Sequence, residues 1–519
     1  MSGPQSFYLP SSVTPTQLIS DLSQEFLVST PKTITRRLTF IDTFDWRLYH
    51  KSLVAYCRDD TLCLRKLNSH QIIHQQAGLP APKFAADLPA GPLKLLLAPV
   101  IEMRALLPRA SVQVQTEVFA ILNRDQKTVV RLAFEKLFRP EQPNDNGSWP
   151  RLWLLPVRGY PGPAEKLAAA LPDLGLEAVE QPDMLLLALE QAGQTPGDYS
   201  TRLDVQLPSA ARSDEAAKAI LGHVLPVIRQ NEAGIKQDID TEFLHDFRVA
   251  IRRTRAVLSQ LKGVLPADAS DRFRREFGDI ARTTNDLRDL DVYLLDAAHY
   301  RAMLPEMLRQ DITPLFDYLR EKRAAALARV VDLLNSETYA QTLHDWQVFL
   351  DQPGNEAAEA PHAGQPVIDL ARRRLKKRYR RVTRFGRKIL KNTQDEQLHA
   401  LRIECKKLRY LLEFFASLFP ADTIGALVKQ LKKLQDNLGD FNDLCVQEAY
   451  LLHLADELPA ADARSRHTLL AIGGLVATLD QKRAQVKSEF AKTFTGFASA
   501  ENKKLFKSLL AAAPDGGTG

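Results

Sequence analysis

The sequence predicts an α+β domain built on an antiparallel sheet over residues 1–200, followed by an all-α domain over residues 205–510. Three observations support this division. Short β-prone runs separated by polar turns fill residues 34–139, and strand signals almost vanish after residue 210. In the second part, a segment of about 80 residues occurs twice, 154 positions apart. The second part is therefore predicted to consist of two helical halves related by internal pseudo-symmetry.

The first domain is predicted from the alternation of its side chains. The run from Ser111 to Leu122 alternates apolar and polar residues with period two, which is typical of a half-buried strand. Further strands are expected at Thr39–Thr43, Leu53–Arg58, Leu62–Leu67 and Thr128–Phe138, with flanking helices at Pro15–Leu27 and Ala164–Leu171. These elements predict a sheet with helices packed against it.

Two breaks in the pattern divide the chain, one between the two domains and one inside the helical domain. A stretch from Gln194 to Ala210 that contains Pro, Gly and Ser ends the β-prone region. A second segment of low hydrophobicity, residues 351–365, is predicted to be a linker inside the helical domain. It separates a first half of about residues 205–350 from a second half of about residues 366–510.

The duplicated segment repeats a histidine and four basic residues in the same register. The first copy reads HDFRVAIRRTRAVLSQL from its histidine, and the second reads HALRIECKKLRYLLEFF. An offset of 154 relates the two sets, which are His245, Arg248, Arg252, Arg253 and Arg255 in the first copy and His399, Arg402, Lys406, Lys407 and Arg409 in the second. The offset also holds downstream, where Asp289 and Leu290 correspond to Asp443 and Leu444.

On a helix, the repeated basic residues form a stripe. At about 100° per residue, His245, Arg248, Arg252 and Arg255 share an arc of roughly 80°. The apolar residues on the other side are expected to face the core; they are Phe247, Ile251, Leu258 and Leu261 in one copy and Leu401, Cys405, Leu408, Leu412 and Phe415 in the other. A solvated helix face usually mixes acids with bases, but this arc holds no acid. The stripe therefore favours an anionic ligand.

A second basic segment precedes the second copy. Residues 372–391 contain twelve Lys or Arg and no Asp or Glu. Leu375, Tyr379, Val382 and Ile389 still recur with helical spacing, so a helix with one apolar face is predicted. The cations on its remaining surface repel one another unless a polyanion or nearby acids such as Asp436, Asp440 and Asp443 offset them.

Composition limits the classes of function. The whole formal net charge of +6 belongs to residues 201–519, because residues 1–200 carry 20 basic and 20 acidic side chains. No run of 18 uncharged apolar residues occurs, and the N-terminus lacks the pattern of a signal peptide, so a cytoplasmic protein without a membrane partner is expected. The cysteines show no zinc spacing, and no metal or cofactor is predicted.

The duplicated pattern His-x-x-Arg-x-x-x-Arg-Arg-x-Arg resembles that of the CHAD family, the histidine-containing α-helical domains, over about residues 205–510. The resemblance implies two pseudo-symmetric four-helix bundles that meet at a basic groove or pore. It further implies non-catalytic binding of inorganic polyphosphate, often at polyphosphate granules. The residues implied for binding are the two sets of five given above, from His245 to Arg255 and from His399 to Arg409.

The N-terminal domain resembles a CYTH, or triphosphate tunnel, domain. The segment from Phe40 to Tyr49 is similar to the stretch after the first CYTH helix. That family opens with a Glu-x-Glu-x-Lys strand whose acids hold a divalent metal, whereas no acid precedes Asp21 here. The resemblance therefore implies a degenerate barrel or half-barrel that has lost hydrolysis. Basic residues on its strands that could line an anion tunnel or face solvent are Arg58, Arg65, Arg131 and Lys136.

Two alternatives stay open. A metal-dependent triphosphatase in the N-terminal domain requires a metal held by Glu117, Glu135 or another acid. Non-specific nucleic-acid binding through residues 372–391 would use the same cations on a phosphodiester backbone. Against it, the basic face shows no aromatic residues for base stacking, since Tyr379 belongs to the apolar side. The sequence predicts neither an oligomeric state nor a chain-length preference.

Overall fold

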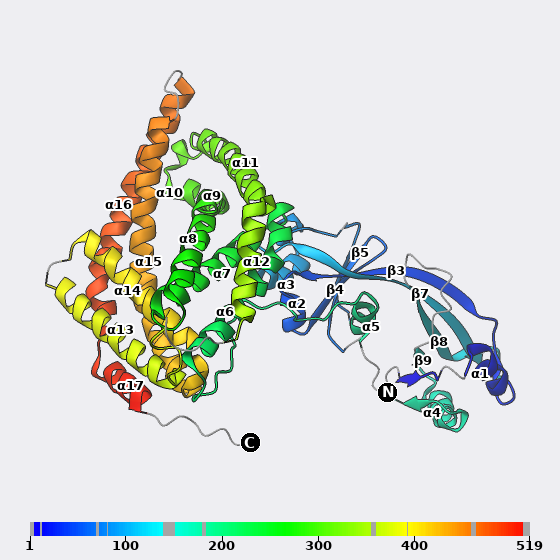
Figure 1. The fold of residues 1–519 in the computed structure, drawn as a ribbon. Helices are drawn as coiled ribbons and strands as arrows, with labels where there is room; N and C mark the ends of the chain where they lie inside the picture. The colour runs from blue at the N-terminus through cyan, green and yellow to red at the C-terminus, as the bar shows by residue number, and fades with distance from the viewer. Residues whose placement is uncertain are drawn as a thin grey trace. The chain divides into compact units, whose positions relative to one another are not determined.

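The computed structural model describes most of the chain. The described residues are 5–10, 13–68, 72–79, 81–138, 151–178, 183–353, 360–391, 393–457 and 463–511. The chain divides into two compact units, residues 1–200 and residues 201–519 (Figure 1). The first unit is α+β and the second is all-α, so the predicted fold classes are confirmed. The predicted linker of residues 351–365 lies partly outside the described residues, at 354–359.

The first unit is built on one antiparallel sheet with the strand order β10-β1-β9-β8-β7-β3-β4-β5-β6, in which β2 pairs with β7. Its strands are β1 Gln5–Tyr8, β2 Leu27–Val28, β3 Lys32–Thr43, β4 Leu53–Arg58, β5 Thr61–Lys66, β6 Ile72–Ala77, β7 Leu106–Leu122, β8 Thr128–Phe138, β9 Arg151–Pro156 and β10 Glu177–Ala178. The order ends at β10 and β6, so over the described residues the sheet is open. Strands β4 and β8 have the predicted bounds, whereas β3 and β7 begin earlier than predicted.

Helices cover both faces of this sheet. They are α1 Pro15–Leu22, α2 Arg47–His50, α3 Pro92–Ile101, α4 Pro161–Ala170 and α5 Met184–Gln191, with single 3₁₀ turns at Ala85–Asp87 and Pro172–Leu174. On one face Phe119 and Phe134 pack with Leu18 of α1 and Leu167 of α4. Near β4 and β5 the same face packs with α3 through Ala55, Leu62 and Leu64. On the other face Val112 and Val114 pack with α5. Because successive side chains of the long strands point to opposite faces, they contribute to separate apolar cores on the two sides of the sheet.

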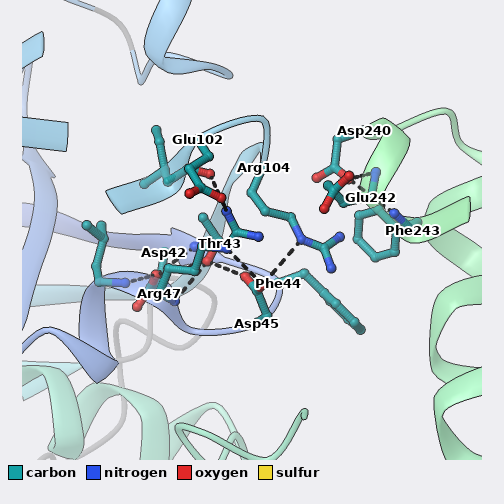
Figure 2. A network of polar contacts seen from close by, with 12 residues as sticks. Asp42, Thr43, Phe44, Asp45, Arg47, Glu102, Arg104, Asp240, Glu242 and Phe243 are labelled. Carbon is teal, nitrogen blue, oxygen red and sulfur yellow. Dashed lines mark hydrogen bonds and ion pairs between the residues drawn. The ribbon is translucent and has the colours of Figure 1, made fainter. Parts of the chain in front are cut away.

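The segment from Phe40 to Tyr49 forms a turn held by carboxylates (Figure 2). The carboxylate of Asp42 accepts hydrogen bonds from the backbone N–H groups of Thr43, Leu48 and Tyr49 at 2.7–2.9 Å. Burial raises the pKa of Asp42 to about 6, although these three hydrogen bonds and the charge of Arg109 oppose the rise. Its carboxylate therefore satisfies the backbone at the start of α2.

Asp45, in the same segment, is held by two arginines from different elements. Its carboxylate lies 2.9 Å from Nε of Arg47 and 3.4 Å from Nε of Arg104 (Figure 2). These charges, together with a hydrogen bond from Thr43, lower the pKa of Asp45 despite its burial. The acids of this segment thus stabilise the loop between β3 and α2.

The second unit contains only helices in its described part. They are α6 Ser213–Lys236, α7 Thr241–Gln260, α8 Ala267–Thr283, α9 Asn285–Leu295, α10 Ala297–Met303, α11 Thr313–Asn335, α12 Glu337–Asp351, α13 Val367–Ile389, α14 Asp395–Phe414, α15 Ala421–Glu457, α16 Ala463–Phe497 and α17 Ala500–Ala511, with 3₁₀ turns at Glu306–Leu308 and Ala416–Leu418. Among these described residues, none of the helices has both the length and the apolar character needed to cross a bilayer.

The helix boundaries reproduce the duplication. Adding 154 to the first residue of α6, α7 and α8 gives the first residue of α13, α14 and α15, and the last residues of α7 and α14 obey the same offset. One difference separates the halves. A break at Thr284 divides α8 from α9, whereas α15 runs through the corresponding position as one helix of 37 residues.

The two halves are joined by reciprocal backbone contacts between equivalent residues. Arg212 and Pro366, which differ by 154, form an isolated antiparallel bridge. On either side of it, Ser213 N donates to Gln365 O at 3.0 Å, and Val367 N donates to Ala211 O at 2.9 Å. Exchanging the two halves converts each of these hydrogen bonds into the other. A local two-fold axis therefore passes through this bridge. The predicted pseudo-symmetry is therefore present in the backbone.

Candidate functional site

A cavity of about 900 Å³ opens in the helical unit among α7, α9, α11 and α15. Three residues of the first predicted stripe, His245, Arg248 and Arg252, line it from α7. The remaining walls come from α9 and α11 in the same half and from α15 in the other half. The cavity is therefore shared between the two halves of the duplication.

Helix α7 presents the first stripe because its other face is buried. Asp240 caps the helix by accepting hydrogen bonds from the backbone N–H groups of Glu242 and Phe243 at 2.9 and 3.3 Å (Figure 2). The residues predicted to face the core are buried in both copies; they are Phe247, Ile251, Leu258, Leu261, Leu401, Cys405, Leu408, Leu412 and Phe415. Helical periodicity then leaves the basic residues on the opposite side.

Arg248 is fixed by the break between α8 and α9. Its guanidinium donates to Ala281 O at 3.0 Å, to Thr284 Oγ1 at 2.7 Å and to Asn285 Oδ1 at 2.8 Å. Burial lowers the pKa of Arg248 to about 10, although the charge of Asp289 opposes this effect. Arg248 is therefore a positioned cation in the cavity wall.

Arg252 and Lys406 are equivalent residues of the two halves, and they lie near each other. Burial lowers the pKa of Lys406 to about 8, and the positive charges of Arg402 and Arg252 add to this effect. Over the described residues, neither Arg252 nor Lys406 forms a hydrogen bond or ion pair. The two stripes thus meet as a pair of like charges, whose repulsion the nearby carboxylate of Asp443 opposes without forming an ion pair with either.

The second stripe lies beside the cavity rather than in its wall. His399 Nδ1 is 2.6 Å from Asn442 Oδ1, and Arg402 Nη2 donates to Asp443 Oδ1 at 3.1 Å. Asp443 itself lines the cavity from α15. Arg402 therefore lies next to the cavity and contacts its wall at the carboxylate of Asp443.

Four predicted binding residues are directed elsewhere. Arg253 donates to Thr201 O and pairs with Glu413, and Arg409 also pairs with Glu413. Lys407 pairs with Glu404 at 2.9 Å, and the guanidinium of Arg255 lies against Gly278 of α8. Arg253, Arg255, Lys407 and Arg409 therefore do not line this cavity, because helical rotation and local acids turn them away from it, and their part in binding stays a prediction.

The cavity also contains residues that the repeated pattern did not single out. Further cations are supplied by Arg288, Lys322 and Arg329, and aromatic rings by Tyr293 and Tyr450. Carboxylates line it as well; they are Asp286, Asp289, Asp296 and Asp443. Burial raises the pKa of Asp289, with Arg248 opposing the rise and Asp286 and Asp443 adding to it. The repeated Asp-Leu pair at residues 289 and 443 was the one sequence signal for this acidic wall.

Helix α13 carries the predicted basic segment, and its apolar face is confirmed by the burial of Leu375, Val382 and Ile389 and by the stacking of Tyr379 on Phe506 at 3.8 Å. Arg378 and Arg381 pair with Glu404 of α14, an acid that the sequence did not single out among those able to offset these charges. Seven cations on the solvent side have no hydrogen bond or ion pair over the described residues; they are Lys376, Lys377, Arg380, Arg384, Arg387, Lys388 and Lys391.

In the first unit the acids proposed for a metal lie on opposite faces of the sheet. Glu117 is paired with Phe134, and Glu135 is paired with Thr116. Paired residues share a face and neighbouring residues alternate, so Glu117 and Glu135 cannot hold one ion together. Glu135 also accepts a hydrogen bond from Nε1 of Trp153 at 2.8 Å. The described residues contain no group of three or more His, Cys, Asp or Glu side chains arranged for a metal.

The four strand cations proposed for a tunnel do not converge. The strand register places Lys136 on the face opposite to Arg58, Arg65 and Arg131. Arg65 is buried and forms a bidentate pair with Asp183. The prediction of a common anion tunnel is therefore wrong for Arg65, whose charge is used inside the protein, and for Lys136, which faces away.

Several known proteins are similar to parts of this chain. An uncharacterized protein of Mycobacterium tuberculosis strain CDC 1551 is 24% identical over 287 residues, which is 53% of this chain and 54% of the relative. Its counterpart in strain H37Rv has the same identity and coverage. This chain spans about half the length of the curated relatives that it matches.

Two solved structures are also similar. The CHAD domain from the plant Ricinus communis has a TM-score of 0.48 and 23% identity, and the match covers 57% of this chain and 97% of that chain. A putative adenylyl cyclase from Hippeastrum, described as having a dominant triphosphatase activity, has a TM-score of 0.26 and 15% identity. That match covers 38% of this chain and 99% of that chain.

The family model of the CHAD domain matches residues 219–452. The match runs from α6 to α15, so it includes both basic stripes, the linker between them and the helices around the cavity. This part of the chain, residues 219–452, is a CHAD domain.

Proposed function

We propose that the helical unit binds inorganic polyphosphate, without catalysis, at the cavity and the paired cations beside it. The observation that carries this proposal is the approach of Arg252 and Lys406 from equivalent positions of the two halves. Like charges held together without an ion pair raise the free energy of the empty site, and a polyanion offsets their repulsion. The CHAD match supports the same ligand, because the resemblance to that family implies polyphosphate binding.

The side chains suit a repeating phosphate chain. The planar fork of Arg252 can contact two phosphate oxygens at once, while Lys406 supplies a point charge and Arg248, held by its hydrogen bonds to the break after α8, supplies a fixed one. Each charge-assisted hydrogen bond contributes about 1.5–3 kcal/mol, so a few contacts support tight binding after the ordering costs. A receptor of this kind would collect at polyphosphate granules.

Charge reversal at the paired cations tests the proposal. We expect Arg252→Glu combined with Lys406→Glu to weaken binding of long-chain polyphosphate at least about 100-fold, since two contacts of the strength given above are lost and repulsion replaces them. The measurement is a titration of folded full-length protein at fixed salt. A matched control reverses two exposed cations away from the cavity, Arg274→Glu on α8 and Lys503→Glu on α17. Equal affinity of wild type and the first variant would exclude the site.

Non-specific nucleic-acid binding through α13 is a second candidate, favoured by its seven cations without partners. Five of them, Lys376, Arg380, Arg384, Arg387 and Lys391, follow one another at intervals of three or four residues, which places them on one side of the helix. Reversal of Arg380, Arg384 and Arg387 to Glu would then lower the salt dependence of DNA binding and leave polyphosphate bound at the cavity. If duplex DNA at a matched phosphate concentration displaces polyphosphate from wild type, the nucleic-acid function takes precedence.

A further inference from the structure

The cavity has a second wall that the basic stripes do not explain. Tyr293 of α9 and Tyr450 of α15 line it, with ring centroids 4.8 Å apart and ring planes at 29°. Val292 and Val446 continue this wall, and they remain 36% and 52% exposed. An inorganic phosphate chain has no apolar surface, so it gains nothing from these groups.

A buried hydroxyl in this wall also has no partner. Tyr293 is 6% exposed, and its Oη makes no hydrogen bond within the described residues. Burial raises its pKa, so the hydroxyl stays protonated and available as a donor. A buried polar group without a partner costs free energy that a ligand acceptor would recover.

The carboxylates of the cavity point to the same kind of ligand. Asp289 and Asp296 line the α9 side, where they repel a bare phosphate chain, while Asp286 on the same side is paired with Arg329 at 3.1 Å. Carboxylates are good acceptors for hydroxyl and amino groups, which inorganic phosphate does not offer as a sugar or a base does. A wall of cations, a wall of aromatic rings and a set of acceptors together match a molecule with three different parts.

We propose that this cavity takes a nucleotide. The phosphates bind at Arg248 and Arg252, the base packs against Tyr450, and the sugar hydroxyls or base amino groups donate to the aspartates. This inference rests on the proposed function, because the same cations hold the phosphates of either ligand. A volume of about 900 Å³ lies within the range of about 300–1,000 Å³ that is usual for small-molecule sites, so a nucleotide can be enclosed.

The test compares ATP with inorganic tripolyphosphate, which share a triphosphate and differ in the nucleoside. Both are titrated into full-length protein by calorimetry in buffer with EDTA. We expect ATP to bind about tenfold more tightly or better, because stacking of the base on an aromatic ring adds to the contacts that both ligands make through the triphosphate. Tyr450→Leu should abolish this preference and leave the tripolyphosphate affinity unchanged, whereas Tyr450→Phe should keep the preference.

A control and three outcomes complete the design. Leu452→Ala alters an exposed residue of α15 outside the cavity lining and should change neither affinity. Equal affinities for ATP and tripolyphosphate would overturn the nucleotide inference and leave polyphosphate binding intact. A preference for ATP that persists in Tyr450→Leu would place the nucleotide elsewhere and also overturn it. Failure of ATP, tripolyphosphate and long-chain polyphosphate to bind would overturn the inference and the proposed function together.

Discussion

Lys406 shows how a single residue can couple charge to binding. Its pKa of about 8 means that the free protein loses this charge as the pH rises from 7 to 9, while a bound polyanion favours the protonated form. We therefore predict that polyphosphate affinity falls over this range and that binding at pH 8.5 takes up a proton. Calorimetry in buffers with different ionisation enthalpies measures this uptake.

The control for that prediction is Lys406→Arg. Arginine keeps its charge at these pH values, so the fall in affinity between pH 7 and 9 should be much smaller in the variant. If the variant and the wild type lose affinity in parallel, another group is responsible for the pH dependence.

The lowered pKa of Lys406 has the opposite effect on folding stability, which should rise with pH while polyphosphate affinity falls. The folded pKa of about 8 lies below the unfolded value of 10.5, so between these values the unfolded chain binds more protons and stability rises with pH. At pH 7 the charge on Lys406 opposes folding. We expect Lys406→Met to raise the thermal unfolding midpoint at pH 7 while weakening polyphosphate binding, and a lower midpoint would contradict this account.

Arg65 illustrates a cation that the fold itself uses. Its side chain is 7% exposed and that of Asp183 is 2% exposed, and Asp183 also accepts from the backbone N–H groups of Asn68 and Leu185. Removal of the arginine leaves a buried carboxylate without its counter-charge. Arg65→Met should therefore destabilise the first unit by about 3–5 kcal/mol.

Urea unfolding of the full chain measures that loss. Arg36→Met on β3 is the matched control, because Arg36 is exposed and its replacement should cost about 0.5 kcal/mol or less. Polyphosphate binding by folded Arg65→Met should equal that of wild type. A stable variant with impaired binding would restore Arg65 as a ligand residue.

Among the elements, α13 depends on a close approach to α16. A Cβ added at Gly386 would lie 1.9 Å from a ring carbon of Phe494, whose side chain is fully buried. We predict that Gly386→Ala destabilises the helical unit by about 1–3 kcal/mol, because the packed ring has to move. Thermal or urea unfolding provides the measurement.

Gly425 in α15 supplies the contrasting substitution. Nothing lies within 4 Å of a Cβ at that position. Gly425→Ala should therefore stabilise by up to ~1 kcal/mol through helix propensity alone. Similar effects of the two substitutions would show that the contact between α13 and α16 is not as close as described.

At the scale of the whole molecule, every residue assigned to polyphosphate binding belongs to the second compact unit. We predict that residues 201–519 alone bind long-chain polyphosphate within about threefold of the full chain, which is less than 1 kcal/mol. Residues 1–200 alone should not bind it. Loss of more than tenfold on removal of the first unit would mean that its cations take part.

The sequence by itself determined the two fold classes, the duplication and the buried face of each basic helix. These features are local, because helical and strand periodicity fix which side chains share a face. The 154-residue offset then reappears in the bounds of α7 and α14 and in the bridge between Arg212 and Pro366. Local pattern was sufficient for these properties.

Only the tertiary structure decided which charged groups meet. Arg65 pairs with Asp183 across 118 residues, Arg248 bonds to the break after α8, and Lys406 lies near Arg252 of the other half. Strand register likewise separated Glu117 from Glu135, although each lies on a predicted strand. Periodicity specifies a face but not the partner opposite it. That partner depends on strand register and helix packing, which form only when distant parts of the chain come together.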